Sequence, residues 1–290
     1  MLDEGAEPQE LVDTPFFPQE RYQCGPAALA TVLSSSGVPV EPDDLVDRVY
    51  LPGRQGSLQV EMLAATRMSG RIPYRVDGRL QAVSNELAAG RPVVILQNLG
   101  IAALPKWHFA VIVGIDIARD EIALRSGVDK RRVTSIPTFL RTWRRSDYWG
   151  FVALRPDALP ADVDRERYVS AVAALQKAGR REEAATAWKT ALDVWPRDPV
   201  AQFGLGNIEL AAGNYAAAEE HFRAIIEVDS ASVAARNNLA IALARQGRFA
   251  EAKREISKAL GDNSDPALED ELLDTKKRIV DMSQTAAAQE

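Results

Sequence analysis

The chain has 290 residues, of which 46% are hydrophobic and 26% charged, with 18 glycines and 16 prolines. This length and composition predict a globular protein of two domains and exclude a disordered, collagen-like or disulfide-stapled chain. The formal net charge of −6 comes from residues 157–290, because residues 1–156 carry 18 basic and 18 acidic side chains. We therefore expect no nucleic-acid partner.

Residues 14–156 combine helix and strand patterns. After an acidic tail at residues 1–13, apolar residues at helical spacing predict four helices, within residues 26–37, 44–49, 57–70 and 79–90. Runs rich in Val and Ile then predict strands, at residues 92–98, 108–116, 121–127 and 148–155, with a helix at 138–145. Helices first and strands later favour an α+β domain, and the prolines of RPDALPAD predict a linker at residues 157–164.

Residues 165–264 repeat with a period of 34 residues. Equivalent positions carry glycine (Gly179, Gly213, Gly247), alanine (Ala184, Ala218, Ala252) and a large apolar residue (Trp188, Phe222, Ile256). Each unit offers two helical stretches joined at the glycine, and the small alanine lets them approach closely. The pattern resembles the tetratricopeptide repeat, which implies an all-α solenoid of three repeats. We expect a polar capping helix at residues 265–283 and a tail at 284–290.

One cysteine and two histidines limit the chemistry of the chain. Cys24 excludes an intrachain disulfide and a multi-cysteine metal centre, and we expect no cofactor. It stands directly before Gly25 and Pro26, at the start of the predicted helix PAALATVL, where unpaired N–H groups and the helix dipole favour a thiolate. His108 opens a strand and offers a base, and Gln19 offers an amide donor to an oxyanion. Taken singly, each is more often an ordinary buried or solvated residue.

Together, the segments PFFPQERYQCGPAALATVL and WHFAVIVGID resemble the bacteriocin-processing cysteine peptidases, papain-like domains that cleave double-glycine leader peptides. The resemblance covers residues 13–154 and is closest in spacing to stand-alone members of the family. It implies that Gln19 is the oxyanion donor, Cys24 the nucleophile and His108 the general base.

The sequence departs from the family after the histidine. The family's Asp-Pro is replaced by LRSG, which places Ser126 at the position of the acid that orients the histidine. Asp129 ranks below Ser126 as a substitute. Asp116 is eight residues beyond His108, roughly 26 Å along an extended strand, and therefore lies at the wrong end.

We expect a thiol peptidase that cleaves a peptide or protein substrate, with the repeats recruiting the substrate or a protein partner. Two alternatives stay open: a catalytically degenerate scaffold that binds peptide, which the LRSG departure favours, and acyl or glutamyl transfer by the same dyad. The inner face of the repeats is expected to present polar side chains to a partner, namely Gln202, Asn207, Arg236 and Asn237.

The chain contains no leader-like segment and no run of 18 apolar residues, so we expect no transmembrane segment. It is expected to be soluble as given. Its compartment stays open, because an exported protein, periplasmic or membrane-anchored, would have lost its leader.

Overall fold

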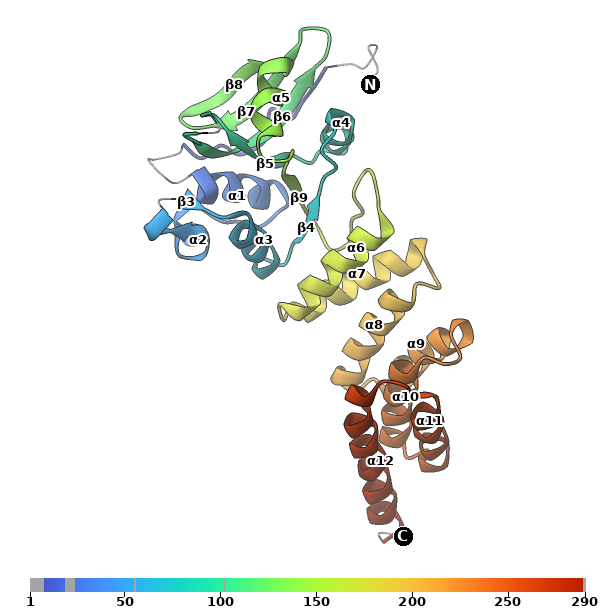
Figure 1. The fold of residues 1–290 in the computed structure, drawn as a ribbon. Helices are drawn as coiled ribbons and strands as arrows, with labels where there is room; N and C mark the ends of the chain where they lie inside the picture. Colours follow the sequence, from blue (N-terminus) through green and yellow to red (C-terminus); the bar gives the residue numbers. More distant parts are fainter. Residues whose placement is uncertain (1–7, 19–23, 55, 102, 289–290) are drawn as a thin grey trace. The chain divides into compact units, whose positions relative to one another are not determined.

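The computed structural model describes residues 8–18, 24–54, 56–101 and 103–288 (Figure 1). The chain divides into two compact units that meet between Glu183 and Ala184. The predicted domain limits, with a linker at 157–164, remain a prediction, and the first helix of the predicted repeats lies in the N-terminal unit.

The N-terminal unit is built on an antiparallel sheet. Its strands lie in the order β4 (Ile72–Arg75), β9 (Gly150–Leu154), β5 (Val93–Asn98), β6 (Trp107–Asp116), β7 (Glu121–Ser126) and β8 (Asp129–Ser135). One face packs against three helices, α1 (Cys24–Ser35), α2 (Asp43–Val49) and α3 (Gln59–Met68). The helices α4 (Leu80–Ala88) and α5 (Ile136–Arg144) contact β5, and a small second sheet joins β2 (Tyr50–Leu51) to β3 (Gly56–Ser57).

The sequence analysis did not predict the two edge strands of the large sheet, β4 and β8. β8 has the sequence DKRRVTS, and all but one of its residues are exposed. β4 carries a proline, which a sheet tolerates at its edge because the missing N–H needs no partner there. Charged residues likewise protect an edge from pairing with another chain.

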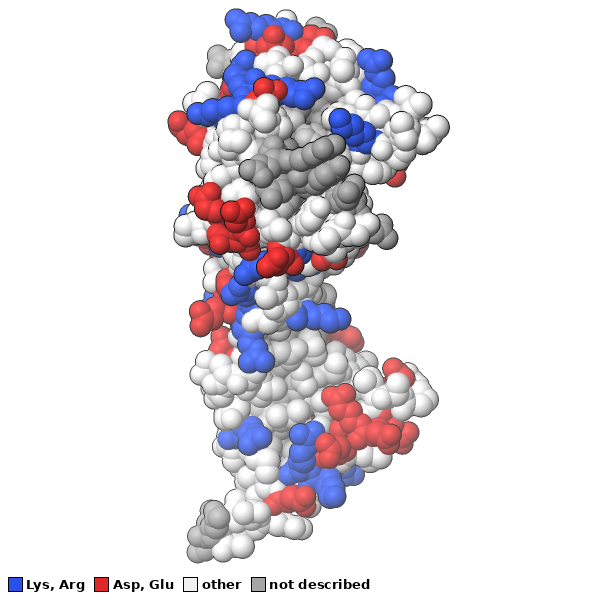
Figure 2. Space-filling view, turned by 90° about the vertical axis from the view of Figure 1, so that its left-hand side faces the viewer, with Lys and Arg blue, Asp and Glu red and all other residues white. Residues whose placement is uncertain are grey.

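On the face drawn in Figure 2, Lys and Arg side chains gather over the upper part of the N-terminal unit, with Asp and Glu side chains below them.

The expected N-terminal tail was wrong for residues 9–13. Gln9 and Glu10 form β1, which pairs with β6 beyond the end of β5. The buried Arg125 donates from Nη2 to the carbonyl of Val12 at 2.9 Å, and Arg131 forms an ion pair with Glu10 at 2.8 Å. A free strand edge and an arginine that needs acceptors thus hold this segment in place.

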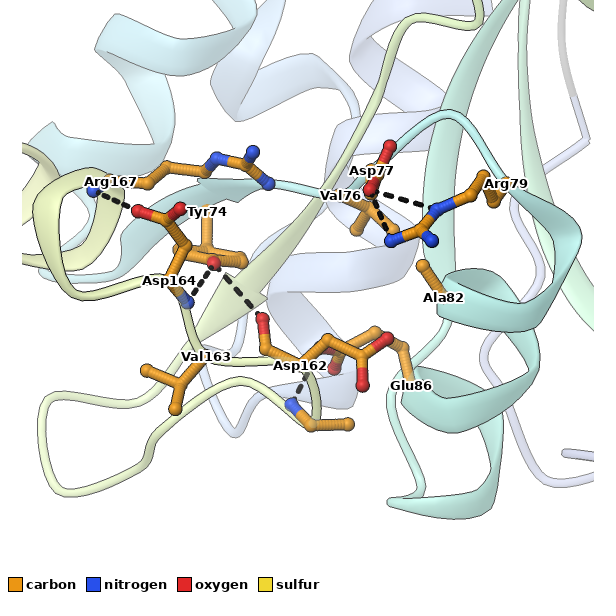
Figure 3. A pocket seen from close by; sticks show the side chains of 11 residues that line it. Tyr74, Val76, Asp77, Arg79, Ala82, Glu86, Asp162, Val163, Asp164 and Arg167 are labelled. Atoms are coloured by element: carbon orange, nitrogen blue, oxygen red, sulfur yellow. Dashed lines mark hydrogen bonds and ion pairs between the residues drawn. The ribbon is translucent and has the colours of Figure 1, made fainter.

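The segment expected as a linker is tied to the N-terminal unit (Figure 3). The hydroxyl of the buried Tyr74 donates to the carbonyl of Asp162 at 3.1 Å and accepts from the N–H of Asp164 at 3.0 Å. The N–H of Ala161 donates to the carboxylate of Glu86 at 2.8 Å. Asp164 then caps α6 (Arg165–Lys177) by accepting from the N–H of Arg167, so the helix begins directly after this bound segment.

The remaining helices follow the predicted period of 34 residues. They are α7 (Arg181–Val194), α8 (Pro199–Ala212), α9 (Tyr215–Val228), α10 (Val233–Arg245), α11 (Phe249–Asp262) and α12 (Pro266–Ala287). Gly179, Gly213 and Gly247 end their helices at φ values of 84°, 84° and 77°, a left-handed conformation that glycine adopts without a steric penalty. The in-phase alanines and large apolar residues are buried, as predicted. Helix α12 continues to Ala287, four residues beyond the expected capping helix.

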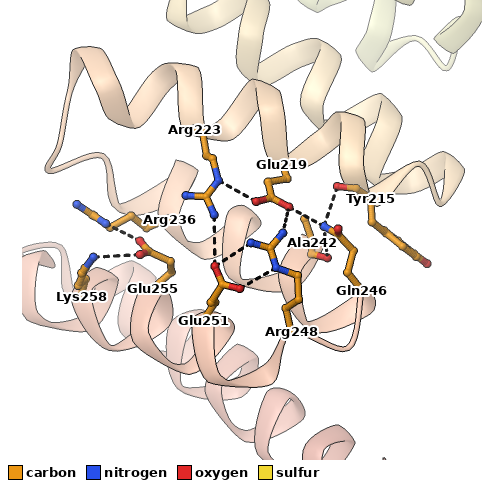
Figure 4. Close-up of polar contacts among 10 residues, drawn as sticks. All are labelled: Tyr215, Glu219, Arg223, Arg236, Ala242, Gln246, Arg248, Glu251, Glu255 and Lys258. Atoms are coloured by element: carbon orange, nitrogen blue, oxygen red, sulfur yellow. Dashed lines mark hydrogen bonds and ion pairs between the residues drawn. The ribbon is translucent and has the colours of Figure 1, made fainter.

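Polar side chains expected on the inner face of the repeats instead bind other residues of the array. Arg236 and Asn237 are only 8% and 3% exposed, and Arg236 pairs with Glu255 at 2.6 Å. Arg248 bridges Glu219 and Glu251 in a second cluster drawn in Figure 4. Gln202 contacts His221, and Asn207 accepts from Asn238. The expectation that Arg236 and Asn237 face a partner was therefore wrong, because their donors are used between helices.

Candidate active site

Cys24 is the first residue of α1, a helix buried on every side. All residues from Gly25 to Leu33 are buried, because the sequence GPAALATVL is apolar around its full circumference. Gly25 packs against Ser57 of β3, whose Oγ would lie 2.0 Å from a Cβ at this position. Only glycine therefore fits after the cysteine, and this contact fixes the start of the helix.

The first turn of α1 meets β6 at a free edge. On the side of β7 the first paired residue of β6 is Val111. Among the described strands, residues 107–110 therefore have a partner only on the side of β5. Leu96, which lies opposite Phe109, donates its N–H to Trp149 rather than to β6. The Phe109 N–H consequently points away from β5. It donates to the thiol of Cys24. The sulfur therefore lies beside the peptide unit that joins His108 to Phe109.

The environment of the Cys24 thiol differs from the expected thiolate. The N–H groups of Phe109, Gly25 and Cys24 itself lower the pKa of the thiol, but burial raises it by more, so the pKa lies above its ordinary value. Desolvation disfavours the charged form, and here it outweighs the helix N-terminus. The thiol is therefore protonated at neutral pH.

His108 lies on the face of β6 opposite Phe109. Its Nε2 is 2.8 Å from the hydroxyl of Ser126, which is 2% exposed. A hydroxyl both donates and accepts, so it can bind either neutral tautomer of the ring, whereas a carboxylate would favour imidazolium. Within the described part of the chain, no hydrogen bond joins the ring to the Cys24 thiol.

Burial, together with the positive charges of Arg132 and Lys106, lowers the pKa of His108 to about 4. In β8, Arg132 lies opposite Leu124 of β7, and its positive charge acts on His108. At neutral pH both the thiol and the imidazole are uncharged.

The other predicted site residues divide into three cases. Gln19 lies outside the described residues. Asp129 lies opposite Ser126 in the register of the β7–β8 hairpin, but the charges that act on His108 are those of Arg132 and Lys106. Asp116 pairs with Glu121 at the far end of β6, as expected from the length of the strand.

Two residues near the site gave no sequence signal. Gln97 is buried directly across from His108 and donates to Thr142 of α5 at 2.7 Å. The Ser57 hydroxyl is buried at the start of α1 and has no hydrogen-bond partner among the described residues. Both belong to strands whose pairing, rather than any motif, brings them to Cys24 and His108.

Neither Cys24 nor His108 lines the pocket of about 500 Å³ beside Tyr74 and Asp162 (Figure 3). Among the described residues, His, Cys, Asp and Glu side chains do not gather in a group that could hold a metal ion. No helix in the described ranges is long and apolar enough to cross a membrane.

Comparison with protein families matches residues 11–148 to the peptidase C39-like family. Residues 170–232 and 209–270 match two models of the tetratricopeptide repeat. The N-terminal region is thus similar to C39-like peptidases, and the C-terminal region is similar to tetratricopeptide repeats. The resemblance and the fold class predicted from the sequence, an α+β region followed by a repeat array, are thereby confirmed.

Two solved structures are among those that match the chain. A Bacillus anthracis protein described as a C39-like peptidase is 16% identical, with a TM-score of 0.42 over 51% of this chain and 98% of that one. The type III secretion translocator chaperone SycD of Yersinia enterocolitica is 18% identical, with a TM-score of 0.37 over 44% of this chain and 88% of that one. Comparison with curated proteins finds no match.

The lowered pKa of His108 predicts a loss of stability in acid. The unfolded chain takes up a proton near pH 6.5, whereas the folded chain does so only near pH 4. The neutral ring therefore contributes fully to the free energy of unfolding above pH 6.5. This contribution, about 3 kcal/mol, is lost as the pH falls from 6.5 to about 4. Urea unfolding of the wild type and of His108→Gln at pH 7.5 and pH 4 measures it. Equal losses in the two proteins would show that His108 is not held neutral.

Proposed function

We propose that the chain is a thiol peptidase of the C39-like type, with Cys24 as nucleophile, His108 as general base and Gln19 as oxyanion donor. The observation that carries the proposal is the contact of the Cys24 thiol with the N–H of Phe109, the residue after His108. Residues more than eighty positions apart are brought together at the first turn of a buried helix, where three N–H groups converge on the sulfur.

The reaction starts from a neutral pair. As the sulfur of Cys24 attacks the peptide carbonyl, its proton passes to His108, whose Nδ1 is the acceptor because Nε2 is engaged by Ser126. The C–N bond then breaks, the imidazolium gives its proton to the leaving amine, and a thioester remains on Cys24. Water activated by the neutral imidazole hydrolyses this thioester. The Cys24 N–H and the Gln19 amide stabilise the oxyanion in both halves.

The repeats are proposed to recruit the substrate or a protein partner. Arg236 and Asn237 cannot serve this role by direct contact, because their side chains bind Glu255 and Glu271 inside the array. The partner would instead contact the exposed residues of the repeats.

A catalytically degenerate peptide-binding protein is the second candidate. Ser126 stands where an acid would stabilise the imidazolium, and the positive charges of Arg132 and Lys106 oppose that charge. These observations favour a slow enzyme or none, whereas the retained thiol and imidazole favour activity.

Labelling with an epoxide-type thiol-peptidase probe tests the proposed dyad. Opening of the epoxide needs both the sulfur and a proton donor, so wild-type Cys24 should react rapidly and stoichiometrically at pH 7. His108→Ala should slow labelling by about 10²-fold, the usual worth of a positioned acid–base group. His221→Ala, which removes the other histidine, is the matched control and should leave the rate unchanged. Equal labelling of wild type and His108→Ala in intact-mass spectra would contradict the dyad.

Ser126→Asp separates the two candidate functions. A carboxylate beside Nε2 should raise the pKa of His108 and stabilise the imidazolium that forms during attack, so labelling of Cys24 should accelerate by about tenfold. Ser126→Asn has nearly the same shape without the charge and should not accelerate it. If neither variant nor the wild type reacts with the probe while all remain folded by circular dichroism, the degenerate candidate is correct.

A further inference from the structure

A groove with a volume of about 580 Å³ runs between α3 and the segment that leads into β9. Leu58, Leu63 and Trp149 supply apolar surface, and Arg67 and Arg75 supply positive charge. This volume is in the range of pockets that hold a small ligand, and here it suits one or two side chains of an extended peptide.

Two walls of the groove adjoin the candidate active site. Leu58 directly follows Ser57, which packs against the first turn of α1. Trp149 packs edge-on against Phe109, with ring centroids 5.7 Å apart, and the Phe109 N–H donates to the Cys24 thiol. A peptide with its carbonyl at Cys24 can therefore extend a neighbouring side chain into the groove.

The two arginines form no ion pair with a carboxylate among the described residues. Nε of Arg67 is buried and makes no hydrogen bond within the described ranges. Arg75 donates from Nε to the carbonyl of Gly150 at 3.1 Å, and its guanidinium lies over the Trp149 ring, 5.1 Å from the centroid. Burial lowers the pKa of both groups, and Arg167 adds repulsion at Arg75. An anionic ligand would supply the missing negative charge.

Asp147 is the carboxylate that lines the groove in the described part of the chain. It is exposed, and no ion pair joins it to Arg67 or Arg75. Its backbone adopts a left-handed φ of 53°, which Asn tolerates as well as Asp. Its charge repels an anion, so Asp147→Asn should act in the opposite sense to the loss of an arginine.

We propose that this groove is a specificity subsite for an acidic side chain of the peptide substrate. The carboxylate of a Glu or Asp would bind the guanidinium groups of Arg67 and Arg75, and its aliphatic stem would lie against Leu63 and Trp149. The inference rests on the proposed function in that the bound peptide is the substrate of Cys24.

Binding of defined peptide pools tests the subsite without requiring turnover. The probes are fluorescein-labelled random hexapeptide pools with either Glu or Gln fixed at one of the six positions, titrated against the full chain carrying Cys24→Ala. At one position the Glu pool should bind about tenfold more tightly than the matched Gln pool, as expected for a charge-assisted contact in a half-buried site. The preference should weaken as salt is raised from 50 to 500 mM.

Variants in the same Cys24→Ala background assign the preference. Arg67→Gln and Arg75→Gln should each reduce it to less than threefold, Arg67→Lys should keep most of it, and Asp147→Asn should increase it. Equal binding of the Glu and Gln pools, a preference that survives both arginine variants, or no binding by any Glu pool at 1 mM protein would overturn the proposal. Circular dichroism confirms that each variant is folded.

Probe labelling of Cys24 in the otherwise unmodified chain separates this proposal from the proposed function. An unreactive Cys24 together with an arginine-dependent Glu preference would leave the subsite standing on a protein that is not a peptidase. A reactive Cys24 with no Glu preference would remove the subsite and leave the thiol chemistry intact.

Discussion

The burial of α1 on every side is the constraint on which the candidate site depends. Because the helix packs against the sheet on one side and against α2 and α3 on the other, its first turn is held against β6. Gly25 completes this constraint, since the contact with Ser57 leaves no room for a side chain. The cysteine is thus held against the strand that carries His108 by packing, without a direct bond between the two side chains.

The same burial governs the electrostatics of the pair. A helix N-terminus favours a thiolate by an amount that water and salt readily offset. Burial raises the pKa of the Cys24 thiol by more, and no positive charge in the described part of the chain offsets it. Arg132 and Lys106 act on His108, where they favour the uncharged ring. A resting ion pair is therefore absent, and the dyad depends on proton transfer during attack. Ser126, which binds either tautomer, suits a ring that begins and ends the reaction uncharged.

The sequence predicted the parts of the molecule that follow local or periodic patterns. The helix at Cys24, the strand at His108 and the 34-residue repeat all follow from apolar spacing and from glycines in phase. The edge strands β4 and β8 could not be found this way, because their proline and their charges are tolerated only through position in the sheet. Nor could the role of Arg125, which orders the N-terminal segment through backbone carbonyls that carry no side-chain signal. Arg236 and Asn237 looked like surface residues because the sequence does not show which helix each one faces.

The central claim is that Cys24 and His108 are both uncharged at rest. The most direct test is an NMR titration of the imidazole Cε1–H signals in the full chain, with His221→Gln identifying the signal of His108. The account predicts a midpoint near pH 4 that is unchanged in Cys24→Ala. A midpoint at or above 6.5 that falls when Cys24 is removed would show a thiolate–imidazolium pair and would contradict it.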